Sequence, residues 1–315
     1  MNFNTIKTRI FDNPLVFILL LIIIVMAFIE PRFISRFNII NVIRQAALVG
    51  IVAVGMTFVI ISGGIDLSVG SVMAMAAVLT AGLYKFSGLP IFISLIFGLL
   101  AGVLSGAIVG YLIYKWKIPP FIASLGAMGA VRGLALVYSA SQPIPGLPKE
   151  FRYLGTGLVG YVPVPVIIWA VIIIIAYYFQ NYHKYGRYNY ALGGNKESLI
   201  LSGVNINKYY VYIYMIAGLL SGIAGVLYCA RLDSGQPMLG VAFELHVIAA
   251  VCLGGASLLG GSGTILGSVL GAILISVIIN VMSILGLSTF TREIAVGVML
   301  IVILSLNIFK SKKAK

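Results

Sequence analysis

The residues best placed to do chemistry in this sequence interrupt two apolar runs. In VIISGGIDLSVGSVMAMAAV, Asp66 and Ser68 stand among Gly63, Gly64 and Gly70. A carboxylate at membrane depth costs several kcal/mol unless it is paired, capped or hydrated. Two interpretations of Asp66 remain open. Asp66 and Ser68 cap the helix that follows the glycines, where free N–H groups and the positive end of the helix dipole lie, or Asp66 lies directly on a transport path.

A second stretch of the chain repeats this pattern. GGASLLGGS (254–262) matches GGIDLSVGS (63–71) at five of nine positions, and each copy lies between apolar runs. Transporters often contain internal repeats with broken helices at corresponding positions, and broken backbone is tolerated where protein or a water-filled cavity surrounds it. The relative orientation of the two copies stays open. The predicted broken-helix residues are Gly63, Gly64, Asp66, Ser68, Gly70, Gly254, Gly255 and Gly261.

Arg132 is the only basic residue inside an apolar segment. Such a charge either extends to the membrane interface or faces a partner or water, and Asp66 is a partner by charge. Cys229 and Cys252 have no spacing that indicates a disulfide or a metal site, and we interpret them as small buried apolar residues. We predict no catalytic residue and no metal ligand.

The elements that position these residues are membrane-spanning helices. Of the 315 residues, 61% are hydrophobic and 9% are charged, whereas a soluble domain carries about 25% charged residues. The sequence predicts an all-α integral membrane protein of about ten apolar segments, some broken or re-entrant, with an internal repeat. The segments are 14–29, 46–62, 69–84, 91–114, 119–138, 163–180, 209–230, 243–257, 262–285 and 292–309.

Charge placement indicates how the chain crosses the membrane. The net charge of +13 lies in short loops and tails, which argues against nucleic-acid binding and for topology signals. With both termini cytoplasmic, the cytoplasmic side carries more positive charge than the outer side, as the positive-inside rule requires. Residues 30–45 carry three arginines on the outer side, and their mixed apolar and polar pattern predicts a helix lying in the interface.

The segments divide the chain into five parts. We predict an N-terminal tail, first transmembrane helix and interfacial segment at 1–45, a first repeat-like half at 46–180, and a cytoplasmic coupling loop at 181–208. A second repeat-like half at 209–309 precedes a basic cytoplasmic tail at 310–315.

Several stretches resemble the membrane permeases of bacterial ABC importers of the ribose type. They are GMTFVIISGGIDLSVGSVMAM, KIPPFIASLGAMGAVRGLALVYS, ALGGNKESLILSGVNI, GLLSGIAGVLYCARLDSGQP and ELHVIAAVCLGGASLLGGSGTILGSVLGA. They occur in the order of that family and cover most of residues 45–305. The resemblance implies a multi-pass protein of the bacterial inner membrane. Its partners would be ATP-binding subunits, an extracytoplasmic solute-binding protein and a second permease copy or paralogue.

The same resemblance implies how ATP hydrolysis drives the permease. No G-x-x-x-x-G-K-[ST] phosphate loop occurs in the chain, so we expect no cofactor on this chain, no enzymatic activity of its own, and ATP bound by a partner subunit. Glu197 and Gly203 look like the acidic residue and glycine of the coupling motif that docks on the ATPase. Ser198 and Leu199 stand where that motif has small alanines.

The expected solute is a monosaccharide, carried over from the resemblance. Nucleosides, autoinducer-like furanoses and branched-chain amino acids are alternatives within the same family. An ion-coupled secondary carrier would need several intramembrane carboxylates, and Asp66 is the one clear candidate. A membrane enzyme would need a nucleophile–base pair or a metal cluster.

Overall fold

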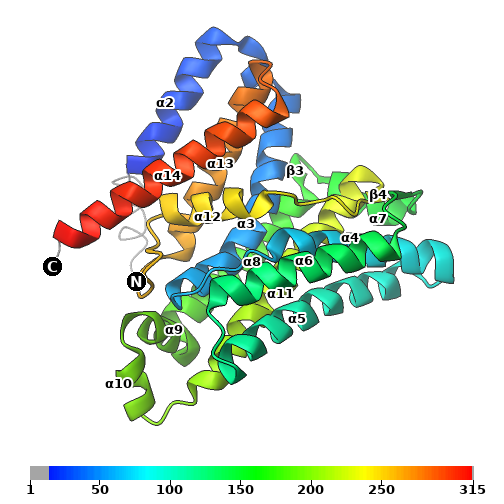
Figure 1. Ribbon diagram of the computed structural model, residues 1–315. Coiled ribbons are helices and arrows are strands. Elements are labelled where there is room, and N and C mark those ends of the chain that lie inside the picture. Colours follow the sequence, from blue (N-terminus) through cyan, green and yellow to red (C-terminus); the bar gives the residue numbers. More distant parts are fainter. Residues whose placement is uncertain (1–13, 314–315) are drawn as a thin grey trace.

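Helices account for nearly all regular structure in residues 14–313, which are the residues that the computed structural model describes (Figure 1). At 303–304 and 306–313 only the backbone is described. The start of the predicted N-terminal tail and the last two residues of the predicted basic tail lie outside this part.

The elements follow one another with short connections. They are α2 (Pro14–Ile29), η1 (Pro31–Ile34), α3 (Arg36–Ile61), α4 (Val69–Ser87), α5 (Ile91–Lys115), α6 (Pro120–Tyr138), β1 (Ile144–Pro145), α7 (Lys149–Thr156), β2 (Leu158–Val159), β3 (Val162–Pro163), α8 (Val164–Tyr182), α9 (Lys184–Gly194), α10 (Lys196–Leu201), α11 (Ile206–Leu232), β4 (Ser234–Gly235), α12 (Phe243–Leu253), α13 (Ile265–Ile284) and α14 (Thr289–Lys313). The strands form two-residue antiparallel pairs, β1 with β4 and β2 with β3.

The prediction of an all-α membrane protein is confirmed. Seven of the described helices, α3, α4, α5, α6, α8, α11 and α13, are long and apolar enough to cross a bilayer, and α2 and α12 are apolar but shorter. The chain is therefore a multi-pass membrane protein. Every one of the ten predicted segments overlaps a helix, but ten crossings are not confirmed by helix length and composition.

Residues 30–45, predicted to include a helix lying in the interface, do not form a helix of their own. Residues 31–34 form the turn η1, and residues from Arg36 onward are the first turns of the long helix α3. Ser35 caps α3, since its hydroxyl accepts a hydrogen bond from the backbone N–H of Asn38 at 3.3 Å. Asn38 and Asn280 exchange amide hydrogen bonds of 3.0 and 2.8 Å. These contacts tie Asn38 to α13.

Two ends of the bundle are distinguished by their short helices. At the α10 end lie α9 and α10 together with the last turn of α3 and the first turns of α6 and α11 (Figure 1). At the α7 end lie α7 and the β1–β4 pair, where Arg44 donates to the carbonyl oxygen of Thr156 at 3.0 Å and Arg231 donates to Gln45 at 3.1 Å. Helix α3 runs from the α7 end to the α10 end, and α11 runs in the opposite direction.

Glycines allow a close helix contact between α5 and α11. A Cβ added at Gly102 would overlap the carbonyl oxygen of Gly218, and one at Gly106 would overlap that of Tyr214. Because lipid supplies no hydrophobic drive between helices, such close backbone approach is how membrane helices associate. The four-residue spacing of these glycines therefore forms a packing face.

Helix packing relates the two halves of the chain. Helix α3 packs on α13 and α11 packs on α5, while α4 contacts α6 and α12 contacts α14. If α3, α4, α5 and α6 are matched in order with α11, α12, α13 and α14, the α3–α13 contact corresponds to the α11–α5 contact, and the α4–α6 contact corresponds to the α12–α14 contact. Helices α3 and α11 run in opposite directions. This pattern supports an inverted repeat of α3–α6 and α11–α14. The two glycine motifs are not equivalent positions in such a repeat, since one precedes α4 and the other precedes α13.

Candidate functional site

The first glycine motif breaks the chain between α3 and α4. Gly63 has φ of +82°, a conformation that favours glycine, and its N–H donates to the carbonyl oxygen of Ile60 at 2.9 Å. The chain then runs without helix until Val69. Asp66, only 1% exposed, accepts hydrogen bonds from the N–H of Ser68 at 2.8 Å and from its hydroxyl at 2.6 Å. Asp66 thus fixes the turn into α4 as an Asx turn, and Ser68 is the N-cap residue but makes no side-chain cap hydrogen bond.

The carbonyl groups that this break frees find partners on other helices. The oxygen of Ile65 accepts from the Ser124 hydroxyl at 3.1 Å and from the Tyr214 hydroxyl at 3.4 Å. Unpaired backbone groups in a membrane core cost several kcal/mol each. Helices α6 and α11 therefore make the break tolerable.

The second motif breaks the chain between α12 and α13. Gly255, Gly260 and Gly261 have φ of +91°, +86° and +73°. Helix α13 begins after Thr264, whose hydroxyl accepts from the N–H of Gly267 at 3.0 Å. Both motifs therefore interrupt helices.

The two breaks touch each other at the α10 end. The N–H of Gly261 donates to the carbonyl oxygen of Ile61 at 2.9 Å. Gly193, near the end of α9, lies against both. A Cβ there would overlap the oxygen of Ile61 and come within 2.6 Å of the nitrogen of Gly261. Three segments that are far apart in sequence thus meet where only glycine fits.

Helix α9 is bonded to both breaks. The Asn189 side chain donates to the carbonyl oxygen of Phe58 at 3.0 Å, in the last turn of α3, and the Tyr190 hydroxyl donates to Gly263 at 2.6 Å. Burial raises the pKa of Tyr190 above its usual value, so the hydroxyl stays protonated and able to donate. Helix α9 leads directly into α10, so α10 is connected to both breaks by one short helix.

The predicted coupling residues lie on α10 and just after it. Glu197 is in its first turn, and the N–H of Ser198 donates to the side chain of Asn195 at 3.0 Å. Gly203 follows the helix with φ of +75°, and a Cβ there would meet open space. Leu199, which replaces a small residue of the motif, is 4% exposed and anchors α10 in the core.

The tip of α10 presents apolar side chains to its surroundings. Leu201 is 87% exposed and Ile200 is 50% exposed, although both lie outside the long apolar helices. Exposed apolar side chains beside polar residues mark protein interaction sites. The surface formed by Glu197, Ile200 and Leu201 is a candidate docking surface.

Arg132 does not pair with Asp66 in the described residues. Its Nη1 donates to the carbonyl oxygens of Pro237 at 2.6 Å and Leu239 at 2.7 Å, in the non-helical segment before α12. The acidic charge that acts on Arg132 belongs to Glu244, in the first turn of α12. Arg132 thus fixes a segment that enters the bundle from the α7 end.

Glu244 is a residue that the sequence analysis did not single out. Its Oε2 would lie 3.1 Å from a Cβ added at Gly70, and such a Cβ would overlap the carbonyl oxygen of Gly240. The starts of α4 and α12 therefore meet inside the bundle, next to the carboxylate. Its position could have identified it, because Glu244 is the first residue of the apolar run ELHVIAAVCL.

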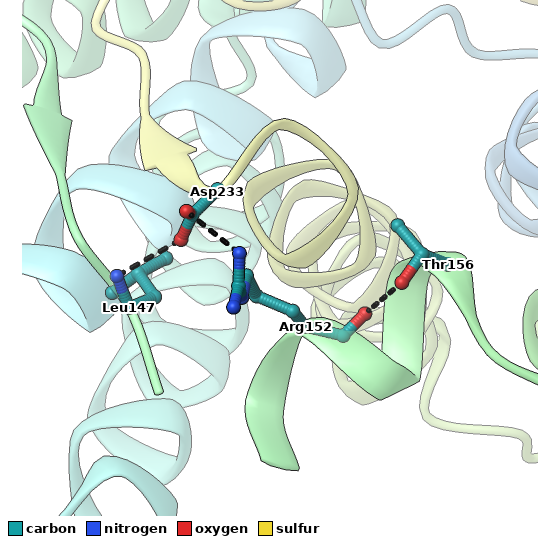
Figure 2. A network of polar contacts seen from close by, with 4 residues as sticks. All are labelled: Leu147, Arg152, Thr156 and Asp233. Atoms are coloured by element: carbon teal, nitrogen blue, oxygen red, sulfur yellow. Dashed lines mark hydrogen bonds and ion pairs between the residues drawn. The ribbon is translucent and has the colours of Figure 1, made fainter. Parts of the chain in front are cut away.

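The α7 end is closed by a network around Asp233 (Figure 2). Asp233, with φ of +54° after α11, accepts from the N–H of Leu147 at 2.9 Å and from Arg152 at 3.2 Å. Arg152 in turn accepts through its carbonyl oxygen from the Thr156 hydroxyl at 2.9 Å. These bonds join α7 to the loop that leads toward Pro237.

Cysteine and histidine side chains form no site in the described part of the chain. Cys229 and Cys252 are buried and free, and the thiol of Cys229 lies 3.5 Å from the carbonyl oxygen of Ala77. Within residues 14–313, no group of three or more His, Cys, Asp or Glu side chains could hold a metal ion.

Known proteins that resemble the chain include sugar import permeases. The chain is 42% identical to the ribose import permease protein RbsC of Haemophilus influenzae, over 94% of this chain and 93% of that protein. It is 40% identical to RbsC of Bacillus subtilis, over 93% and 91%. It is 33% identical to the D-allose transport system permease protein AlsC of Escherichia coli K12, over 94% and 91%. No solved structure gives a significant match.

A family model covers the same part of the sequence. The model described as "Branched-chain amino acid transport system / permease component" matches residues 38–304, which include both helix breaks, α9 and α10. With relatives above 30% identity along nearly the whole length, the conclusion is direct: the chain belongs to this permease family of membrane transport components.

Proposed function

We propose that the chain is the transmembrane permease subunit of an ATP-driven, binding-protein-dependent importer of a monosaccharide, with a ribose-like sugar as substrate. The observation that carries the proposal is the match of more than 90% of the chain to ribose import permeases at 40–42% identity. D-allose appears in the name of a more distant relative at 33% identity. Ribose is therefore the first solute to test.

The chain is proposed to act through partners. Two ATP-binding subunits bind and hydrolyse ATP, an extracytoplasmic solute-binding protein delivers the sugar, and a second copy or a paralogue completes the permease. No cofactor is bound by the chain itself, and it catalyses no reaction. The absence of a phosphate loop from the sequence supports this division, because ATP hydrolysis needs that backbone cradle.

Helix α10 is proposed as the site where the ATPase docks. Its apolar tip at Ile200 and Leu201 and its acidic Glu197 form the contact surface. A shift of α10 passes to α9 and from there to the bonds at Phe58 and Gly263. ATP hydrolysis could in this way move both helix breaks at once and so shift the permease between its conformations.

The proposed docking of the ATPase on α10 sets the orientation of the chain in the membrane. The α10 end, the loop 181–208 and both termini lie in the cytoplasm of a bacterium, and the α7 end faces outward. The excess of lysine and arginine on the α10 side supports this arrangement. A cysteine at Leu201 labelled by an impermeant maleimide only in inside-out vesicles is the expected result. Labelling in right-side-out vesicles would reverse the orientation.

Reconstitution tests the function. The chain is co-purified with its partners from native membranes in mild detergent, identified by mass spectrometry, and placed in liposomes. ATPase activity should rise when a ribose-loaded binding protein is added, with uptake of labelled ribose and weaker uptake of allose or fructose. A protein that purifies without an ATPase and takes up solute under an ion gradient would instead be a secondary carrier.

A further inference from the structure

An apolar groove runs along the flank of the bundle between α8 and α11, with α3 as its floor. Two adjoining cavities of about 380 and 390 Å³ form it. Residues that line both cavities are Phe58, Phe179, Ile216 and Leu219. The groove is therefore continuous from α9 toward the middle of the bundle.

The groove is long enough to hold a lipid acyl chain of one leaflet. Its lining extends from Tyr209 to Ile223 on α11, which is about 21 Å at the rise of an α-helix. One leaflet contributes about half of a hydrocarbon core of about 30 Å. On the rim, Ile175 is 57% exposed and Ile216 is 37% exposed, so the open side is also apolar.

The mouth of the groove, at the α10 end, combines aromatic and basic residues. Tyr185, Tyr209 and Tyr212 form a cluster with ring centroids 5.3 to 6.5 Å apart, and all three line the groove. Lys184 lies with its Nζ 5.8 Å from the centre of the Tyr185 ring, and Lys208 directly precedes Tyr209. Tyrosines mark the level of lipid headgroups, and lysines attract anionic ones.

One buried polar atom in the groove lacks a partner. Asn189 is 4% exposed and lines the groove at its α10 end. Its amide nitrogen donates to Phe58, but its Oδ1 accepts no hydrogen bond. Buried polar atoms are nearly always paired. This oxygen is covered by protein atoms, so Asn189 lies at the closed inner side of the groove.

We infer that the groove binds one anionic phospholipid. Its acyl chain lies between α8 and α11, and its phosphate lies near Lys184 and Lys208. The inference goes beyond sugar import and does not depend on it. Because Asn189 also holds the last turn of α3, the bound lipid contacts the helix that links α10 to both breaks.

Native mass spectrometry of the full-length chain in mild detergent tests the inference. Phosphatidylglycerol and phosphatidylcholine with the same acyl chains serve as probes. One phosphatidylglycerol should survive collisional activation, and about tenfold less phosphatidylcholine should be retained. Ile216→Trp fills the groove and should lower phosphatidylglycerol retention about tenfold. Ile174→Trp, at an α8 residue that is 69% exposed and outside the groove lining, is the matched control and should retain the lipid.

The headgroup is tested separately. Lys184→Gln should lower the preference for phosphatidylglycerol over phosphatidylcholine, and Lys115→Gln, an exposed residue at the end of α5, should not. Equal retention of the two lipids by the unaltered chain, or retention that Ile216→Trp leaves unchanged, would overturn the inference. Loss of a second protein chain without loss of lipid in Ile216→Trp would also overturn it, because a protein would then fill the groove.

Discussion

Gly261 donates its backbone N–H to the carbonyl oxygen of Ile61 at 2.9 Å, which joins the two helix breaks of the permease directly. The two breaks cannot move independently while this bond holds. Gly193 of α9 packs against both residues. The contact of these three segments is therefore the place where motion of α10 would reach the interior of the bundle.

Replacing Gly193 with alanine should separate the breaks. Alanine normally stabilises a helix by about 1 kcal/mol relative to glycine, but here its Cβ would overlap backbone atoms that cannot rotate away. We expect Gly193→Ala to lower the free energy of unfolding by about 1–3 kcal/mol and to reduce uptake more than ATPase activity. Gly194→Ala is the control, because its Cβ has no neighbour closer than 3.8 Å. Equal behaviour of the two variants would contradict the three-way contact.

Position 203 should accept a larger side chain, but not a residue that disfavours a positive φ. Its φ is +75° and the space around it is open. A β-branched residue in this conformation is strained by about 1–2 kcal/mol, whereas asparagine enters it readily. We expect Gly203→Val to reduce ATP-driven uptake in liposomes while the chain still reaches the membrane, and Gly203→Asn to keep uptake near normal. If both variants transport normally, the end of α10 plays no part in coupling.

A neutral side chain that accepts hydrogen bonds should be able to replace Asp66. Asparagine retains the oxygen that accepts from Ser68, and alanine removes it. We expect Asp66→Ala to destabilise the chain by about 0.5–2 kcal/mol and Asp66→Asn to fold and transport nearly normally. Thermal unfolding and uptake are measured on the same preparations. A well-folded Asp66→Asn chain that has lost uptake would favour the alternative, a direct role of the carboxylate on the transport path.

Arg132 should couple energetically to Glu244 and not to Asp66. The Arg132 side chain holds the segment before α12, and Glu244 supplies the nearby negative charge. A double-mutant cycle of Arg132→Gln with Glu244→Gln should give an interaction energy of about 0.5–3 kcal/mol in thermal unfolding. The cycle with Asp66→Asn should be additive within about 0.5 kcal/mol. The reverse result would restore the pairing of Arg132 with Asp66.

The sequence was informative where local chemistry decides the structure. Apolar runs of sufficient length predict the helices, and clustered glycines with Asp66 predict the break before α4, since both depend on neighbouring residues. Asp66 forms an Asx turn because its oxygen reaches the N–H two residues later. The family resemblance singles out residues of α10 and Gly203, and their coupling role stays a prediction.

Long-range packing could not be predicted from those patterns. Nothing local indicates that Gly193 lies between Ile61 and Gly261, or that Arg132 contacts backbone carbonyls instead of Asp66. The polar position Asn38 finds its partner at Asn280, far along the chain, which no local pattern indicates. The contact of Glu244 with the start of α4 is equally hidden, because the segment before α12 enters the bundle without helical structure.

The partners of the first break also set an order for biosynthesis. The carbonyl oxygens of Ile61 and Ile65 depend on donors at Ser124, Tyr214 and Gly261, all of which are synthesised later. A nascent chain that has inserted α3 and α4 therefore carries unpaired backbone groups in the membrane until those helices arrive. Chains truncated before residue 261 should be targets for membrane proteases, which would make the break a checkpoint for completeness of the permease.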